Sequence, residues 1–135
     1  MASMIHNLSM INRCFLLLGL LLLHGCAVQV SREAFSASRG GRSDPVIIDV
    51  RTRGEYDRGH IPGAVHIPVL SLPFHLDRVP VSSRNQEVVV YCAHGPRAVL
   101  AAFFLKVAGF SNLRHLQGNF VGWEKAGYPV EKSEY

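Results

Sequence analysis

A cysteine at the junction between an apolar strand and a helix constrains this chain more than any other feature. The run from Val88 to Tyr91 is β-branched and aromatic, which is typical of a buried strand. The segment from Ala98 to Ala108 is rich in alanine, leucine and phenylalanine, which favours a helix. Because Cys92 lies between the two, the sequence predicts a strand, a short loop that begins with a cysteine, and a helix.

The rest of the chain alternates short apolar strands with helical segments. Strands are expected at residues 28–30, 46–50, 64–67, 88–91 and 113–116. Helical segments are expected after an N-cap at Ser31, around residues 54–58, over 70–77, and from Arg97 to a terminal Gly109. With 135 residues, 48% of them hydrophobic, the chain can bury one core. The pattern predicts one α/β domain with a parallel sheet covered on both faces.

The N-terminus has the composition of an export signal. Arg13 precedes a nine-residue run, 15–23, that contains only leucine and phenylalanine apart from Gly19. This run is shorter than the roughly 20 apolar residues that a bilayer span needs. The segment therefore indicates a secretory signal peptide rather than a membrane span.

The end of this segment, Leu23 to Cys26, resembles the bacterial lipobox, in which cleavage before the cysteine is coupled to its acylation. The resemblance implies a lipoprotein-type signal peptide over residues 1–25, an exported domain over 26–135 and a lipid anchor on Cys26. Ala27 in the next position indicates the outer rather than the inner membrane, and hence a periplasmic, lipid-anchored location. An ordinary signal peptide and a short uncleaved anchor are the alternatives.

The three cysteines then have different fates. Cys14 leaves with the signal peptide and Cys26 is acylated, so the exported domain keeps Cys92 and no partner for an internal disulfide. A lone cysteine in an oxidising compartment is either buried and inert or reactive and kept for its chemistry.

The loop after Cys92 is suited to hold a negatively charged sulfur. Ligands of parallel α/β sheets bind beyond the carboxyl ends of the strands, where this cysteine lies. Backbone N–H groups of the loop and the positive end of the next helix would stabilise a thiolate or an anion attached to it. Glycine allows a tight turn, and arginine adds a forked cation. The predicted loop site consists of Cys92, Ala93, His94, Gly95, Pro96 and Arg97.

Four separated motifs occur in order in the exported part. They are Ile48-Asp49-Val50-Arg51 with Glu55-Tyr56, then Gly59-His60-Ile61-Pro62-Gly63-Ala64 with His66-Ile67-Pro68, then the loop 92–97, and then Leu116, Gly118, Trp123, Gly127 and Tyr128-Pro129-Val130. Together they resemble the single-domain rhodaneses, a sulfurtransferase family. The resemblance implies a twisted parallel β-sheet flanked by α-helices on both faces. It also implies a Cys92 persulfide that takes sulfur from a small sulfur-containing anion, such as thiosulfate, and gives it to a thiol or cyanide without a metal or other cofactor.

Three residues depart from the usual pattern of that family. Asn119 replaces a second glycine, which we expect to be a local loop change. Pro96 removes one N–H donor and fits the first position of a helix. Ala93 stands where many thiosulfate-using members have a cation, so the positive charge must come from Arg97 and His94.

The charged residues Asp49, Arg51 and Glu55 are interpreted as supporting groups. A buried carboxylate at a strand end can accept backbone N–H bonds, and a partly buried arginine needs an acidic partner. Glu55 is a candidate partner for Arg97. His60 and His66 do not have the spacing of metal ligands and are interpreted as structural.

Two other functions are weighed against sulfur transfer. A non-catalytic rhodanese-like module could carry sulfur or bind a protein at the membrane surface. A phosphatase or arsenate reductase is more distant, because those enzymes place one more residue between the cysteine and the arginine than this loop does. The net charge of +4 is scattered, so nucleic-acid binding is not indicated, and the sequence does not reveal the oligomeric state.

Overall fold

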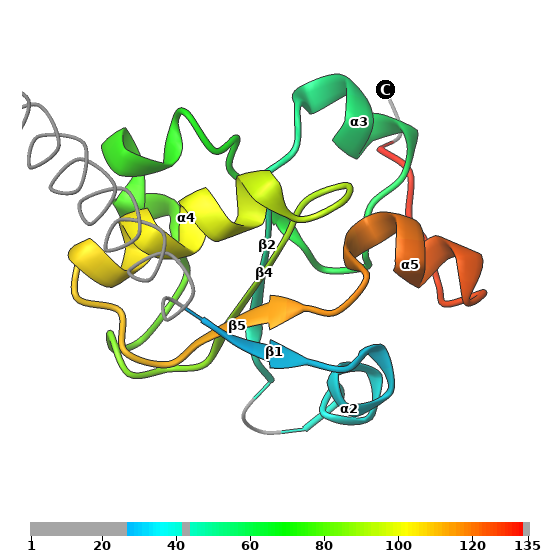
Figure 1. The fold of residues 1–135 in the computed structure, drawn as a ribbon, viewed down its shortest axis with the longest axis horizontal. Coiled ribbons are helices and arrows are strands. Elements are labelled where there is room, and N and C mark those ends of the chain that lie inside the picture. Colours follow the sequence, from blue (N-terminus) through cyan, green and yellow to red (C-terminus); the bar gives the residue numbers. More distant parts are fainter. Residues whose placement is uncertain (1–26, 42–43, 134–135) are drawn as a thin grey trace, which may run out of the picture.

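The computed structural model describes residues 27–41 and 44–133, in which five parallel strands form one sheet (Figure 1). The strands lie in the order β1-β5-β4-β2-β3. Their bounds are β1 Val28–Val30, β2 Val46–Asp49, β3 Val65–His66, β4 Val88–Tyr91 and β5 Leu113–Leu116. The predicted parallel α/β fold is confirmed.

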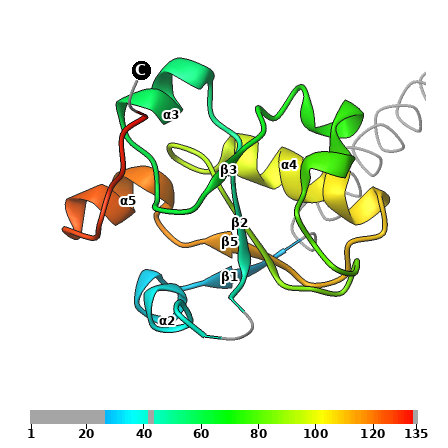
Figure 2. The same ribbon diagram turned by 180° about the vertical axis from the view of Figure 1, so that it is seen from behind.

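Helices connect these strands and cover both faces of the sheet (Figures 1 and 2). They are α2 Arg32–Ala37, α3 Arg53–Arg58, α4 Pro96–Val107 and α5 Asn119–Lys125, with 3₁₀ turns η1 Leu72–Phe74 and η2 Leu76–Arg78. Two helices begin at side-chain caps that the sequence provides. The hydroxyl of Ser31 accepts the N–H of Ala34, and Thr52 and Glu55 form a reciprocal capping box at α3.

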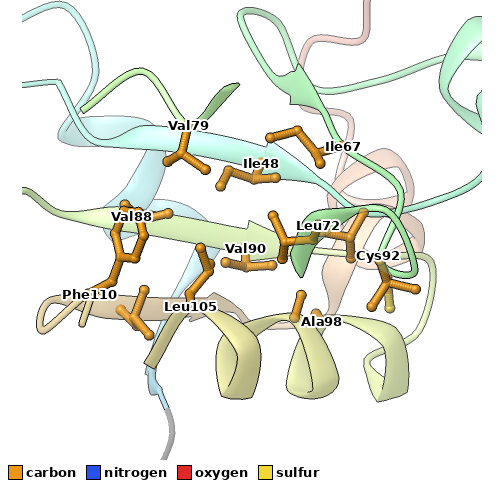
Figure 3. Close-up of a cluster of buried hydrophobic side chains, with 14 residues drawn as sticks. Ile48, Ile67, Leu72, Val79, Val88, Val90, Cys92, Ala98, Leu105 and Phe110 are labelled. Carbon is orange, nitrogen blue, oxygen red and sulfur yellow. The ribbon is translucent and has the colours of Figure 1, made fainter. Parts of the chain in front are cut away.

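The strands bury alternate side chains on opposite faces of the sheet. On β4, Val88 and Val90 point toward α4, whereas Val89 and Tyr91 point toward the other helices. Figure 3 shows the core on the α4 face, with Cys92 at one end of it. The opposite core is made of Phe35, Ile47, Ile61, Ala64, Val89, Tyr91, Leu116, Phe120 and Trp123.

Two helical segments differ from the sequence prediction. The short helix expected over residues 70–77, interrupted or started by Pro73, is replaced by two 3₁₀ turns, because Pro73 has no N–H and His75 leaves the helical region at φ −134°. Helix α5 was not predicted at all. It begins at Asn119 and buries Phe120 and Trp123, and the latter stacks on Tyr128 with 4.4 Å between ring centroids.

The predicted signal peptide, residues 1–25, and the predicted lipidation residue, Cys26, lie outside the described residues. Within 27–41 and 44–133, no helix has the length and apolar character that crossing a membrane requires.

Candidate active site

Cys92 begins a tight loop at the carboxyl end of β4. Its side chain is buried, with 1% of the residue exposed, and the backbone N–H of Gly95 donates to Sγ at 2.9 Å. Gly95 has φ +131°, a conformation that a residue with a Cβ rarely adopts. Pro96 is the first residue of α4, as predicted. Ala93 is half-buried and His94 is exposed. Of the predicted loop residues, Gly95 through its N–H and Arg97 through its side chain interact with the sulfur.

Asp49 and Arg51 form a buried ion pair at the end of β2, directly beside the cysteine loop. Asp49 lies opposite Tyr91 in the parallel register, one residue before Cys92. The guanidinium of Arg51 donates to Asp49 at 2.6 Å through Nη2, and its backbone N–H donates to the same carboxylate at 2.9 Å. Asp49 is 0% exposed and Arg51 is 4% exposed, so both members of the pair are buried.

The surroundings of Arg51 keep its guanidinium charged. The Arg51 guanidinium also donates to the carbonyl of Gly59 at 2.6 Å and lies over the ring of Phe120 at 3.9 Å. Burial alone lowers the pKa of Arg51, but the hydrogen bonds and charge of Asp49 outweigh it and raise that pKa. Burial and the Asp49 carboxylate also raise the pKa of Tyr91, whose hydroxyl accepts the N–H of Ile61. Tyr91 therefore stays protonated and serves as a fixed structural group.

Glu55 and Arg97 form a two-point ion pair across the loop. Nη1 and Nη2 of Arg97 donate to the two carboxylate oxygens of Glu55 at 2.7 and 2.8 Å. These hydrogen bonds, with those from Thr52, lower the pKa of Glu55 well below its usual range. The same contact with Glu55, together with the nearby sulfur of Cys92, raises the pKa of Arg97. Arg97 thus lies between Glu55 and the sulfur.

Asn119, at the start of α5, binds the backbone at the start of the cysteine loop. The local loop change that the sequence predicts at this position does not include this contact. Its side-chain oxygen accepts the backbone N–H of Cys92 at 3.0 Å and lies 3.1 Å from Nε2 of His115. Because this oxygen can only accept, Nε2 of His115 carries the proton. Asn119 has φ +52°, a region that asparagine tolerates better than most residues, which was the available sequence signal at this position.

The two other histidines that the motifs contain make structural contacts. His60 and His66 both stack on the ring of Tyr56, with centroid distances of 3.7 and 4.7 Å. A ring nitrogen of His66 lies 2.8 Å from the carbonyl oxygen of Arg51. No three histidine, cysteine or acidic side chains gather as a metal site within 27–41 and 44–133.

A cleft of about 290 Å³ is lined by residues of α3 and α5 and their neighbours. It is connected to the loop through Phe120, whose N–H donates to the carbonyl of Cys92 at 3.0 Å, and through Glu55, which binds Arg97. The residues that line it are Arg51, Glu55, Arg58, Gly59, Phe120 and Glu124.

The family profile of the rhodanese-like domain matches residues 33–126, which include the strands β2 to β5 and the whole cysteine loop. The chain belongs to the rhodanese-like family. This rhodanese-like chain is 27% identical over 106 residues to a sulfurtransferase of Allochromatium vinosum, covering 78% of this chain and 96% of that one. It is 34% identical over 88 residues to the thiosulfate sulfurtransferase GlpE of Pseudomonas fluorescens, and the alignment covers 65% of this chain and 77% of that one.

A solved structure is similar in fold over nearly its whole length. The crystal structure of a rhodanese-related protein from Thermoplasma volcanium has a TM-score of 0.67 and 25% identity, covering 78% of this rhodanese-like chain and 99% of that one. The predicted family and the predicted sheet with helices on both faces are therefore confirmed.

Proposed function

We propose that this protein is a sulfurtransferase that moves sulfane sulfur through a persulfide on Cys92. One observation carries the proposal: the only sulfur in the described residues sits at the carboxyl end of β4, where Gly95 N–H donates to it and α4 begins. The N-terminus of α4 adds the positive end of its dipole at the same point. The names of the sulfurtransferase relatives from Allochromatium and Pseudomonas support the proposal.

The reaction consists of two displacements at sulfur. The Cys92 thiolate attacks the outer sulfur of the donor, the donor's sulfur–sulfur bond breaks, and the electron pair leaves with the remaining group, which is sulfite when thiosulfate is the donor. A thiol or cyanide then attacks the outer sulfur of the Cys92 persulfide and restores the thiolate. The N–H of Gly95 and the start of α4 stabilise negative charge on the sulfur in both steps. Neither step requires a metal or an organic cofactor.

A second candidate is a non-catalytic module that carries sulfur or binds a protein. It is favoured by Pro96, which removes an N–H from the loop, and by Ala93, which supplies no charge. A phosphatase or arsenate reductase is disfavoured because Arg97 follows Cys92 by five positions, one short of the loop that a tetrahedral oxyanion needs.

A turnover assay separates these candidates. With thiosulfate or an organic persulfide as donor, the protein should produce thiocyanate from cyanide, and Cys92→Ser should not, since a serine hydroxyl without an adjacent base is a poor nucleophile. Hydrolysis of an aryl phosphate and reduction of arsenate should stay at background. Persulfide formation without turnover would support the carrier, and phosphatase activity would overturn the proposal.

We further propose that the protein is a periplasmic lipoprotein, with Cys26 acylated and the outer membrane as its location. The support is the export signal in the sequence and the position of Ala27. This residue is half-buried against the core and leads directly into β1, so that a lipid on Cys26 would hold the domain close to the bilayer. Several acyl chains are needed for stable attachment, since one chain alone binds marginally.

A further inference from the structure

We infer that His115 is a positioning residue for sulfur transfer, which acts on Cys92 through the side chain of Asn119. The inference rests on the proposed sulfur transfer and concerns a residue that the four sequence motifs do not contain. Two observations carry it. A chain of two hydrogen bonds joins His115 to the Cys92 backbone, and Asn119 is held in a left-handed conformation.

The Cys92 backbone fixes the direction of both hydrogen bonds. A backbone N–H can only donate, so the Asn119 atom that lies 3.0 Å from it is the amide oxygen and not the amide nitrogen. The same oxygen lies 3.1 Å from Nε2 of His115 and accepts a second hydrogen bond there. Because two donors bind one oxygen, the Asn119 amide cannot rotate without losing these bonds.

The Asn119 amide and the His115 ring also lie against the residue that contacts the sulfur. A methyl group on Gly95 would lie 3.6 Å from Nδ2 of Asn119 and 3.8 Å from Cε1 of His115. The N–H of Gly95 donates to Sγ of Cys92 at 2.9 Å. The two side chains are therefore neighbours of both ends of this N–H···S contact.

The start of α5 binds the cysteine from its other backbone group as well. The N–H of Phe120 donates to the carbonyl of Cys92 at 3.0 Å, so Asn119 and Phe120 together hold both the N–H and the carbonyl of the cysteine. Figure 1 shows α5 directly after β5, near the loop that precedes α4. His115 belongs to β5 and holds the side chain of the first residue of α5. The position of the sulfur thus depends on how α5 begins.

The backbone of Asn119 is unusual for a residue with a side chain. Its φ is +52°, and it follows Gly118, which is also left-handed at φ +76°. These two residues turn the chain between β5 and α5, and the Asn119 side chain meets His115 across this turn. Left-handed conformations of non-glycine residues persist where the surrounding contacts hold them, and they are concentrated at functional sites.

Placement of the cysteine matters in both halves of the reaction, because the same sulfur reacts twice. The Cys92 thiolate attacks the donor, and the acceptor then attacks the Cys92 persulfide. A small displacement of a reacting atom slows a reaction substantially. A positioning residue should therefore affect both steps, whereas a residue that binds one substrate should affect one step only.

The test compares the full-length wild type with two variants of His115. His115→Phe keeps a ring but has no N–H donor, and His115→Gln restores a donor on its amide. Sulfur uptake by Cys92 from thiosulfate or cysteine persulfide and release of that sulfur to cyanide are measured separately. We expect His115→Phe to slow both steps about threefold to tenfold, the range that one hydrogen bond supplies, and His115→Gln to recover most of the loss. His75→Phe, at an exposed histidine outside the site, is the matched control.

Hydrogen exchange of the Cys92 amide gives a readout that does not require sulfur transfer. Relative to the amides of β4, it should be faster in His115→Phe and close to the wild-type rate in His115→Gln. Unchanged rates in His115→Phe, loss of one step only, or a His115→Gln variant as slow as His115→Phe would overturn the inference and leave the proposed function intact. The expected exchange pattern in a protein that transfers no sulfur would instead contradict the proposed function.

Discussion

The side-chain oxygen of Asn119 accepts the backbone N–H of Cys92 at 3.0 Å and so joins the start of the cysteine loop to the start of α5. The same residue adopts φ +52°, in the left-handed region. Asn119 therefore combines a conformation that favours glycine with a hydrogen bond that glycine cannot make. The loop is held by this amide on one side and by the ion pair of Glu55 with Arg97 on the other.

Replacing Asn119 should lower the free energy of unfolding. The size of the effect should depend on whether the variant loses the hydrogen-bond acceptor, a residue suited to the left-handed conformation, or both. Asn119→Gly keeps the backbone conformation but leaves the buried Cys92 N–H without its acceptor, which costs about 1–3 kcal/mol. Asn119→Ala should cost about 1–2 kcal/mol more, because the left-handed conformation disfavours a residue with a Cβ. Asn119→Asp keeps the acceptor and is the control. Urea unfolding measures the order, and an alanine variant as stable as the wild type would show that the contact is unimportant.

Removing Asp49 should unfold the protein more readily, because Arg51 would remain as a buried charge without its partner. Breaking one side of a buried ion pair typically costs about 3–5 kcal/mol. Asp49→Ala should therefore lower the free energy of unfolding by about that amount and lower sulfur transfer with it, whereas Asp77→Ala, an exposed change, should have little effect. Loss of sulfur transfer with an unchanged unfolding curve would instead indicate that Asp49 takes part in the reaction.

The ion pair of Glu55 with Arg97 should make stability depend on acidic pH. The pKa of Glu55 is lowered in the folded protein from its ordinary value of 4.5, so its contribution is fully present above that value. As pH falls below about 4.5, the unfolded chain takes up the proton first and the contribution is progressively lost. The stability difference between the wild type and Glu55→Gln should shrink over this range in urea titrations. Parallel pH profiles for the two proteins would contradict the lowered pKa.

If Cys26 is acylated, the protein should fractionate with membranes and incorporate a labelled fatty acid. Cys26→Ser should abolish the label and the membrane fraction, whereas Cys14→Ser should retain both, since that residue precedes the expected cleavage point. Wild-type protein that is entirely soluble and unlabelled in the periplasm would exclude the lipid anchor.

The strands could be predicted closely from the sequence because each is a short run with a clear β signal between turn residues. The predicted strand 88–91 coincides with β4, and 46–50 exceeds β2 by one residue. The region 70–77 could not be assigned in the same way. Its apolar residues suit a helix, but Pro73 and the irregular His75 limit it to 3₁₀ turns. Helix α5 was missed because it is only seven residues long and contains Gly122.

Contacts in the site could be predicted from the sequence where a charged residue required a partner of opposite charge, or where glycine and proline indicated the backbone conformation. A glutamate near a strand end and an arginine after the loop suggested the pair of Glu55 with Arg97, and glycine before proline indicated a turn into a helix. The role of Asn119 was not predictable, because a neutral amide carries no charge that points to a partner 27 residues earlier in the chain. The cleft could not be predicted from the sequence either, because its lining residues come from α3 and α5, which are far apart in the chain.

Sulfur transfer through Cys92 can be measured by peptide mass mapping of the full-length protein after treatment with a sulfane donor, either cysteine persulfide or thiosulfate. We expect the peptide containing Cys92 to gain the mass of one sulfur atom, cyanide to remove that sulfur as thiocyanate, and Cys92→Ser to show neither event. Peptides that contain no cysteine serve as internal controls. A Cys92 peptide that stays unmodified with both donors, or sulfur transfer that persists in Cys92→Ser, would contradict a persulfide mechanism on Cys92.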